Sequence, residues 1–295
     1  MSKKWNKYKG EQPPDYVPTG FDEYMGLGRR INIEDHYNKI AYICALVCVG
    51  LSFVYKGMTN TIGAAGIAMS CMATGMAFIF SYMLAQELDP EPKRRWGAVL
   101  GAVLTAAATT VLGDGNILVS LWLLFLIRMF NRTSGDRHRI VDNLLLIGIS
   151  GFLGFKGFWL FPMVMAAAYV LESQIEGGYF RSLYLAGISC IAMFFVDKSM
   201  EQSITINYIY LLAMSMIIFL PELRLAPLTK VNGDKNGKPI STKRLICAQG
   251  VFIMSTVILT VFHGDQMALA MLPGMMAAMG CGISLFVYLT QQKHK

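Results

Sequence analysis

The lysine and arginine residues of this chain lie almost entirely between long apolar stretches, and this pattern limits what the chain can fold into. The apolar stretches are Lys39–Tyr55, Thr61–Leu84, Trp96–Leu112, Ile117–Phe130, Asn143–Phe155, Phe158–Leu171, Ser182–Val196, Ile206–Leu220, Leu245–Phe262 and Met267–Thr290. A helix needs about 20 apolar residues to cross the hydrocarbon core of a membrane. Only 15% of the residues are charged, well below the share in soluble domains. We therefore expect an all-α integral membrane protein with about ten transmembrane or re-entrant helices.

The same charges predict which side of the membrane each connection faces. If the N-terminus is cytoplasmic and each stretch is counted as one crossing, only Lys56, Lys156 and Lys198 of the 26 lysines and arginines fall on the outer side. Lysine and arginine are concentrated in the cytoplasmic loops of membrane proteins. We therefore expect both termini to be cytoplasmic and the chain to lie in the cytoplasmic (plasma) membrane. The net charge of +7 would then face membrane lipids, and no nucleic-acid partner is expected.

The stretch 143–171 could form one long helix or a helical hairpin. A single crossing would move the basic loop 222–244 to the outer side, whereas two passes that meet at 154–157 keep the charge pattern. The pattern thus favours a hairpin. Its arms, like the pair 96–130, are short for a full crossing. Each pair either crosses a locally thinned bilayer or re-enters from the side on which it began, and the sequence leaves both choices open.

Two parts of the chain differ in polarity. Residues 1–38 form a polar cytoplasmic N-terminal segment, and residues 39–295 form the polytopic helical membrane domain. Within the membrane domain, small residues recur four positions apart, at Gly97, Gly101 and Thr105, and again at Gly274, Ala278 and Gly282. This spacing allows helix backbones to approach closely, so we expect helix contacts along these faces.

Ionisable residues are scarce within the apolar segments, and each is a candidate functional residue. Asp114 lies in the glycine-containing turn between two short segments, and Lys156 lies between Gly154 and Gly157. If these turns are at membrane depth, Asp114 and Lys156 are expected to pair and to bind substrate. Otherwise Lys156 extends to the outer interface of the bilayer.

The loop 128–139 is the densest polar cluster and suggests a different site. Arg128, Arg132 and Arg137 could bind a phosphate, since guanidinium groups fit phosphoryl oxygens bidentately. Carboxylates that could hold a magnesium ion beside it are Glu87, Asp89, Glu91, Asp136, Asp142 and Asp234. The alternative is a set of solvated loops that contact lipid headgroups. No metal-ligand spacing is present, and no cofactor can be named.

The sequence is compatible with three functions. The pattern favours a small permease, because short and interrupted helices suit binding near the membrane midplane. The first alternative is a membrane-embedded enzyme that acts on a lipid phosphate at the cytoplasmic face. The second is a non-catalytic scaffold subunit that binds a partner subunit through residues 1–38. The substrate and the coupling ion are not predicted.

Overall fold

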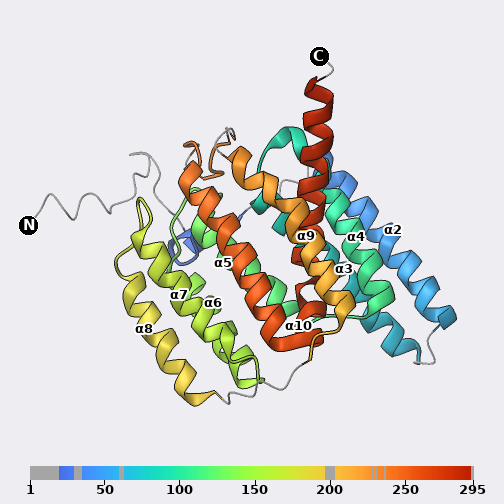
Figure 1. The fold of residues 1–295 in the computed structure, drawn as a ribbon, viewed down its shortest axis with the longest axis horizontal. Helices are drawn as coiled ribbons and strands as arrows, with labels where there is room; N and C mark the ends of the chain where they lie inside the picture. The colour runs from blue at the N-terminus through green and yellow to red at the C-terminus, as the bar shows by residue number, and fades with distance from the viewer. Residues whose placement is uncertain are drawn as a thin grey trace, which may run out of the picture. The chain divides into compact units, whose positions relative to one another are not determined.

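A computed structural model describes residues 20–29, 35–59, 63–196, 203–226, 229, 231–235 and 237–293 (Figure 1). Throughout these ranges the regular structure is helical, apart from a β-bridge between Asn232 and Pro239. The α-helices are α2 His36–Thr59, α3 Ala64–Leu88, α4 Trp96–Leu112, α5 Ile117–Asn131, α6 Ile140–Phe155, α7 Leu160–Gln174, α8 Ser182–Ala192, α9 Ile206–Leu225 and α10 Thr242–Lys293. Short 3-10 helices are η1 Gly20–Glu23, η2 Pro92–Arg94 and η3 Met193–Phe195. The predicted all-α class is confirmed.

Four helices are long and apolar enough to cross a membrane, namely α2, α3, α9 and α10. Shorter apolar helices are α4, α5, α6 and the stretch Ser182–Phe195. Large apolar side chains are exposed on α2, where Leu46 is 76% and Met58 is 83% exposed. Contiguous exposed apolar surface of this kind is typical of contact with lipid or with another protein. These features agree with a membrane-embedded helical protein, while the count of ten segments and the side of each terminus stay predictions.

Helix α10 is broken at Gly264, whose backbone is not helical (φ 65°, ψ −150°). A positive φ is accessible to glycine at little steric cost, which explains why the break occurs at this residue. The chain turns back there (Figure 1). The two sides of the break correspond to the predicted segments Leu245–Phe262 and Met267–Thr290.

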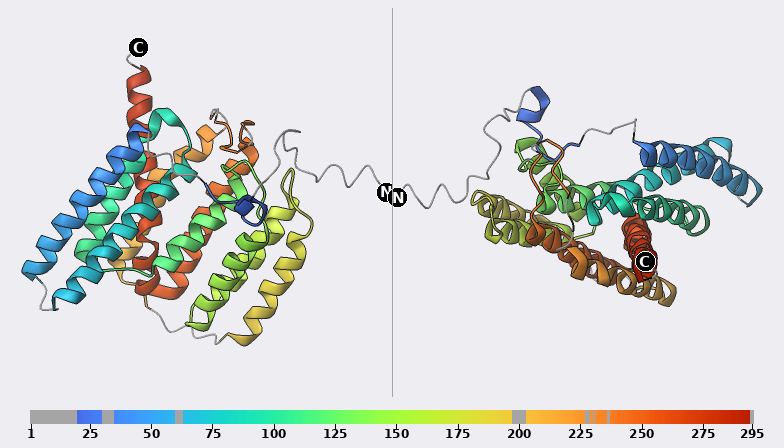
Figure 2. Two further views of the ribbon diagram at one scale, coloured as in Figure 1. Left: turned by 180° about the vertical axis from the view of Figure 1, so that it is seen from behind. Right: turned by 90° about the horizontal axis from the view of Figure 1, so that it is seen from above.

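The stretch 143–171 contains two helices, α6 and α7, as the charge pattern predicts. They are joined at Lys156 and Gly157, where Gly157 has a φ of +99°. Helix α7 packs against both α6 and α8, and the three lie side by side in Figure 2. The stretch is therefore a helical hairpin, although whether its arms cross fully or re-enter stays a prediction.

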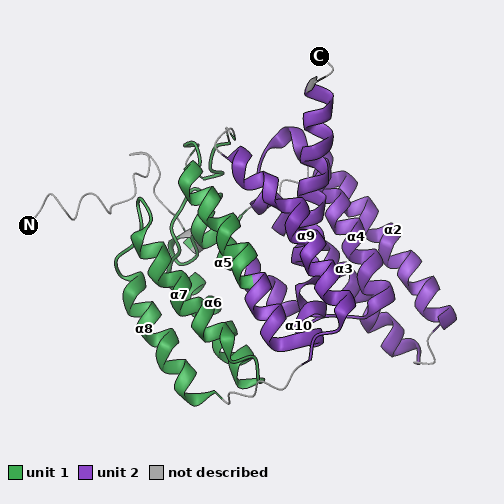
Figure 3. Cartoon of the chain, in the orientation of Figure 1, with its two compact units in different colours: residues 1–30, 125–201, 227–255 green, residues 31–124, 202–226, 256–295 purple. Residues whose placement is uncertain are grey.

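The chain forms two compact units, coloured separately in Figure 3. Unit 1 comprises residues 1–30, 125–201 and 227–255, and unit 2 comprises residues 31–124, 202–226 and 256–295. In unit 1, the fully buried side chains include large apolar groups from α5, α6, α7 and α10. These are Phe130, Leu153, Phe161, Tyr169 and Phe252.

Unit 2 contains the bundle of α2, α3 and α4, which pack against one another. Helix α4 also crosses the second part of α10 with backbones in close contact. A Cβ atom at Gly101 would lie 2.8 Å from the carbonyl oxygen of Met276, and one at Gly280 would clash with the carbonyl oxygen of Gly97. A Cβ atom at Gly282 would likewise clash with the carbonyl oxygen of Ile218 in α9. The close contacts predicted at Gly97, Gly101 and Gly282 are confirmed.

Gly280→Ala tests this crossing. The added methyl group meets backbone atoms of α4 that cannot rotate away, so the free energy of unfolding should fall by about 1–3 kcal/mol. Gly50→Ala on α2 is the control, because nothing lies within 4 Å of the added methyl group. It should leave stability unchanged or raise it by up to about 1 kcal/mol through helix propensity. Thermal unfolding in detergent measures both, and an equal response would refute the close crossing.

Candidate functional site

A partly buried ion pair in unit 2 joins Lys56 of α2 to Asp114 of the turn between α4 and α5. The Lys56 ammonium lies 3.1 Å from Asp114 Oδ1, and the Lys56 side chain is only 4% exposed. Lys56 Nζ also donates hydrogen bonds to the hydroxyls of Ser70 (2.6 Å) and Thr74 (3.1 Å). The Ser70 hydroxyl in turn donates to Asp114 Oδ2. Two opposite charges are thus held together with two hydroxyl groups.

Local features of the chain position this group. Ser70 and Thr74 are one turn apart on α3 and therefore share a face of that helix. Asp114 lies between Gly113, with a φ of +110°, and Gly115. A Cβ atom at Gly115 would lie 2.7 Å from the Cα atom of Ala270, so the turn rests directly on the backbone of α10. The turn holds Asp114 in place through this contact.

A narrow pocket in unit 2 borders Asp114. Its walls combine small apolar side chains with a few polar groups. The lining residues are Ala73, Ala77, Thr109, Asp114, Gly115, Asn116, Ile117, Ser120, Leu269, Ala270 and Pro273. The Asp114 side chain is 30% exposed, whereas Lys56 behind it is almost fully enclosed. The arrangement places one carboxylate, with its counter-charge behind it, at the wall of this narrow pocket.

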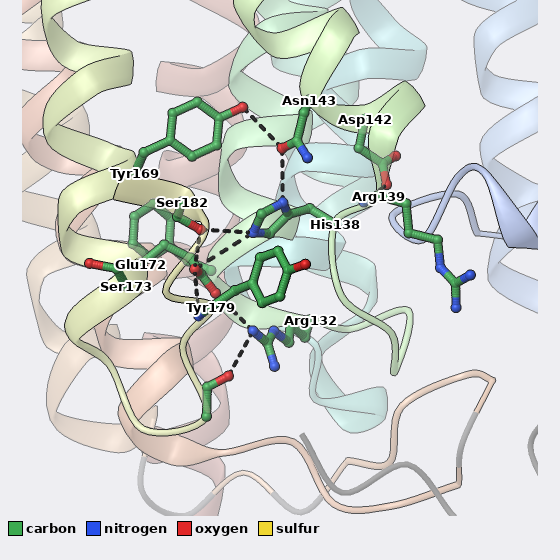
Figure 4. A network of polar contacts seen from close by, with 12 residues as sticks. Arg132, His138, Arg139, Asp142, Asn143, Tyr169, Glu172, Ser173, Tyr179 and Ser182 are labelled. Carbon is green, nitrogen blue, oxygen red and sulfur yellow. Dashed lines mark hydrogen bonds and ion pairs between the residues drawn. The ribbon is translucent and has the colours of Figure 1, made fainter. Parts of the chain in front are cut away.

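A second polar cluster, in unit 1, surrounds Glu172 near the end of α7 (Figure 4). The Glu172 side chain is fully buried, and its Oε1 accepts hydrogen bonds from Arg132 (2.8 Å) and Arg244 (3.4 Å). Its Oε2 accepts hydrogen bonds from the Ser182 hydroxyl (2.8 Å) and the backbone N–H of Tyr179 (3.1 Å). One carboxylate therefore binds the α5–α6 loop, the start of α8 and the start of α10.

The Glu172 carboxylate is the shared counter-charge of two guanidinium groups, those of Arg132 and Arg244. Burial lowers the pKa of the Arg132 guanidinium, and the neighbouring Glu172 carboxylate opposes that shift. The His138 imidazole is also close, with Nε2 lying 3.6 Å from Glu172 Oε2. Breaking a buried ion pair from one side leaves an uncompensated charge. Glu172 is therefore the group on which the cluster depends.

Ser182, His138 and Asn143 are arranged like a nucleophile, a base and an orienting group (Figure 4). Ser182 Oγ lies 3.3 Å from His138 Nε2, and His138 Nδ1 lies 2.8 Å from Asn143 Oδ1. However, the Ser182 hydroxyl donates to Glu172, and Ser182 is fully buried. Because the serine is enclosed and its hydroxyl donates its hydrogen bond to the Glu172 carboxylate, we interpret this arrangement as structural.

The arginines predicted to bind phosphate all make contacts inside unit 1. Arg132 donates to Glu172 and to the carbonyl oxygen of Gly177, at 2.8 and 3.0 Å. The Arg137 guanidinium lies 5.8 Å from the ring centre of Tyr179. Arg128 is buried and donates to the carbonyl oxygen of Leu27 at 3.5 Å. These internal contacts weigh against phosphate binding by the loop, which stays a prediction.

Three of the carboxylates considered for magnesium are bound by groups of the protein. Asp136 pairs with Arg139 at 2.8 Å. Asp142 accepts a hydrogen bond of 2.7 Å from the backbone N–H of Gly26. Asp89 pairs with Arg94 at 2.7 Å.

Part of the predicted docking segment 1–38 contacts its own chain. The backbone N–H groups of Gly26 and Leu27 donate to Asp142, and Arg29 pairs with Asp234 at 2.5 Å. Residues 1–19 lie outside the described part of the chain. Residues 26–29 therefore fasten the segment to unit 1, and partner binding by the remainder stays a prediction.

Asp114 and Lys156, the pair expected from the sequence, belong to different units. The partner found for Asp114 is Lys56. Lys156 is exposed, and its amine lies 5.6 Å from the ring centre of Phe152. The predicted pairing of Asp114 with Lys156 is untested and stays a prediction. Lys56 itself was missed, although the charge count places it on the same side as the turn 113–116.

Within each unit, side-chain contacts join segments that the charge count assigns to one side. In unit 2, Arg94 pairs with Glu222, and both lie in connections predicted to be cytoplasmic. Lys56 pairs with Asp114 across two connections predicted to be outer. In unit 1, the Glu172 cluster unites the predicted cytoplasmic loops 128–142, 172–181 and 222–244. The contacts agree with the predicted topology, and the sidedness itself stays a prediction.

Comparison with known proteins gives no match: no family model, no curated protein and no solved structure shows significant similarity to this chain.

Proposed function

We propose that the chain is a small permease and that the Lys56–Asp114 pair contributes to its substrate site. The observation that carries this proposal is an ion pair beside a pocket, in which the buried Lys56 ammonium binds the partly exposed Asp114 carboxylate. Lys56 lies in the last turn of the apolar helix α2, and ionisable residues of such helices commonly mark the path of a substrate or an ion. Enclosing the Lys56 charge also costs desolvation energy that the pair only partly returns, which favours a functional reason for the pair.

The charges of the pair suggest the class of substrate. Lys56 and Asp114 together carry no net charge, so a singly charged ligand would leave one charge without a partner. A small zwitterion keeps the site neutral, because its ammonium group can bind Asp114 while the Lys56 charge, 3.1 Å from Asp114 Oδ1, balances the carboxylates. The small side chains of the pocket, such as Ala73 and Ala77, also favour a small solute. We therefore propose a small amino acid as the substrate class.

The two alternatives have less support. An enzyme for lipid phosphates would need arginines that face a ligand, whereas Arg132 and Arg244 are bound to Glu172. A scaffold that binds through its N-terminal segment would need that segment to be available, whereas Gly26 and Leu27 are hydrogen-bonded to Asp142. Neither alternative explains an ion pair with an enclosed lysine at a pocket.

Ligand-induced thermal stabilisation of the purified protein tests the proposed site. Glycine and alanine should raise the melting temperature, by about 2.7 kcal/mol in free energy at 100 times Kd, whereas methylamine, acetate and inorganic phosphate should not. Asp114→Asn should abolish the response to glycine, because the ammonium group loses its carboxylate partner.

Glu176→Gln is the matched control for this experiment. Glu176 forms an exposed pair with Lys243 at 3.2 Å, so its loss should leave the response to glycine intact. Stabilisation by phosphate alone would contradict the zwitterion site and support the lipid-phosphate enzyme. A response to glycine that persists in Asp114→Asn would place the site elsewhere.

A further inference from the structure

A third polar cluster, at the opposite end of α3 from Ser70, is buried and contains two carboxylates and one guanidinium. Arg94 Nη2 lies 2.7 Å from Asp89 Oδ1, and Arg94 Nη1 lies 3.2 Å from Glu222 Oε2. The side chains of Arg94, Asp89 and Glu222 are 6%, 3% and 1% exposed. All three residues belong to unit 2.

The charges of this cluster do not balance. With both carboxylates ionised, Arg94 compensates only one of them, and an unpaired buried charge is strongly unfavourable. Two carboxylates that share one site respond by retaining a proton. Consistent with this, Asp89 Oδ2 and Arg94 Nε are buried without a hydrogen-bond partner. Burial raises the pKa of Asp89 to about 6, although Arg94 opposes the shift.

Among the described residues, Arg94 is the one cation whose ion pair with Asp89 or Glu222 is seen. Glu87, on the last turn of α3, is buried and has a partner of its own, and its charge adds to the negative side. Arg95 is paired with Asp35. The Cys281 thiol of α10 donates to the carbonyl oxygen of Ala85 at 3.5 Å. The remaining charged groups on these elements are Glu91, Lys93 and Arg224, which are not buried.

We propose that Asp89 and Glu222 share one proton beside Arg94, and that this proton is the coupling ion of the permease. The coupling part rests on the function proposed above. Binding the proton at a carboxylate oxygen brings the three side chains to zero net charge, and its release leaves one negative charge. Asp89 directly follows α3, the helix that also carries Ser70 and Thr74 of the substrate site. A change of charge at one end can therefore act on the helix that binds Lys56.

Infrared spectroscopy tests the shared proton without any transport assay. The wild-type protein should show the carbonyl band of a protonated carboxylic acid, which disappears as the pH is raised from mildly acidic to mildly alkaline. Either Glu222→Gln or Asp89→Asn alone should remove the whole band, because the charge of the remaining carboxylate is then balanced by Arg94. Asp35→Asn is the control and should keep the band, since Asp35 is paired with Arg95.

Two infrared results would overturn the proposal. Absence of the acid band from the wild-type protein excludes the bound proton, and this result needs no variant to fold. A band that survives in Asp89→Asn assigns the proton to Glu222 alone and excludes sharing.

A pH gradient across proteoliposomes tests the coupling separately, with radiolabelled glycine as the probe. A gradient that supplies protons from the glycine side should accelerate uptake in the wild type and in Asp35→Asn but not in Glu222→Gln. Glycine uptake that is independent of the pH gradient would overturn coupling by this proton. If the wild type takes up neither glycine nor alanine, the proposed function fails and coupling fails with it, while the infrared result alone decides the shared proton.

Discussion

Replacement of Glu172 with alanine is expected to lower the free energy of unfolding by about 3–5 kcal/mol, enough to unfold a marginally stable domain. The expected loss is large because Arg132 and Arg244 both bind Glu172 Oε1, at 2.8 and 3.4 Å, inside a fully buried site. Removal of the carboxylate leaves both guanidinium groups uncompensated. The connections before α6, after α7 and before α10 lose their common partner at the same time.

Glu176→Ala is the matched control for this prediction. Glu176 is four residues further along the chain, and its pair with Lys243 is exposed, at 71% and 78% for the two side chains. Exposed ion pairs contribute only about 0–1 kcal/mol, so little should change. Thermal unfolding in detergent compares the two variants. If Glu172→Ala is as stable as Glu176→Ala, the Glu172 cluster does not hold unit 1 together.

Replacement of Lys56 with methionine is expected to weaken glycine binding by about 10- to 100-fold. The estimate corresponds to the loss of one hydrogen bond to a charged group, about 1.5–3 kcal/mol, at 1.4 kcal/mol for each factor of ten. The substitution also leaves Asp114 without its ammonium partner, so the protein should become less stable. Binding of radiolabelled glycine to the purified protein measures the affinity.

A double variant separates the loss of binding from the loss of stability. Lys56→Met combined with Asp114→Asn removes both charges, so it should recover much of the stability lost in Lys56→Met but none of the binding. Lys243→Met is the control, because it removes an exposed lysine from a pair of similar length. Unchanged glycine affinity in Lys56→Met would show that the lysine does not contribute to the site.

Much of the order of helices along the chain follows from the sequence, because the length of an apolar stretch and the positions of charges are local features. An even number of passes is needed to keep the basic loops on one side, and this predicts the hairpin of α6 and α7. The polar residues 263–266 predict the break found at Gly264. The glycine spacing predicts the close approach at Gly97 and Gly101. The two-unit division could not be predicted, since it depends on contacts between segments far apart in sequence.

The sequence predicts one residue of the candidate site, Asp114, but not its partner Lys56. Asp114 stands out as a lone carboxylate in a glycine-containing turn, but its partner lies 58 positions away in the chain. Lys56 is unremarkable in sequence, since a lysine in the last turn of an apolar helix usually extends to the interface. Glu172 was overlooked because it reads as the first residue of a polar loop. The signal that could have revealed it is the gathering of several basic loops on one side, where an acidic residue is a favourable counter-charge.

Uptake of radiolabelled glycine and alanine into proteoliposomes would test the proposed transport most directly. Vesicles with the wild-type protein are compared with protein-free vesicles and with vesicles that hold the Lys56→Met, Asp114→Asn double variant. We predict saturable uptake by the wild type and none above the protein-free level by the double variant. Equal uptake by all three preparations, or full activity of the double variant, would contradict a permease whose substrate site contains Lys56 and Asp114.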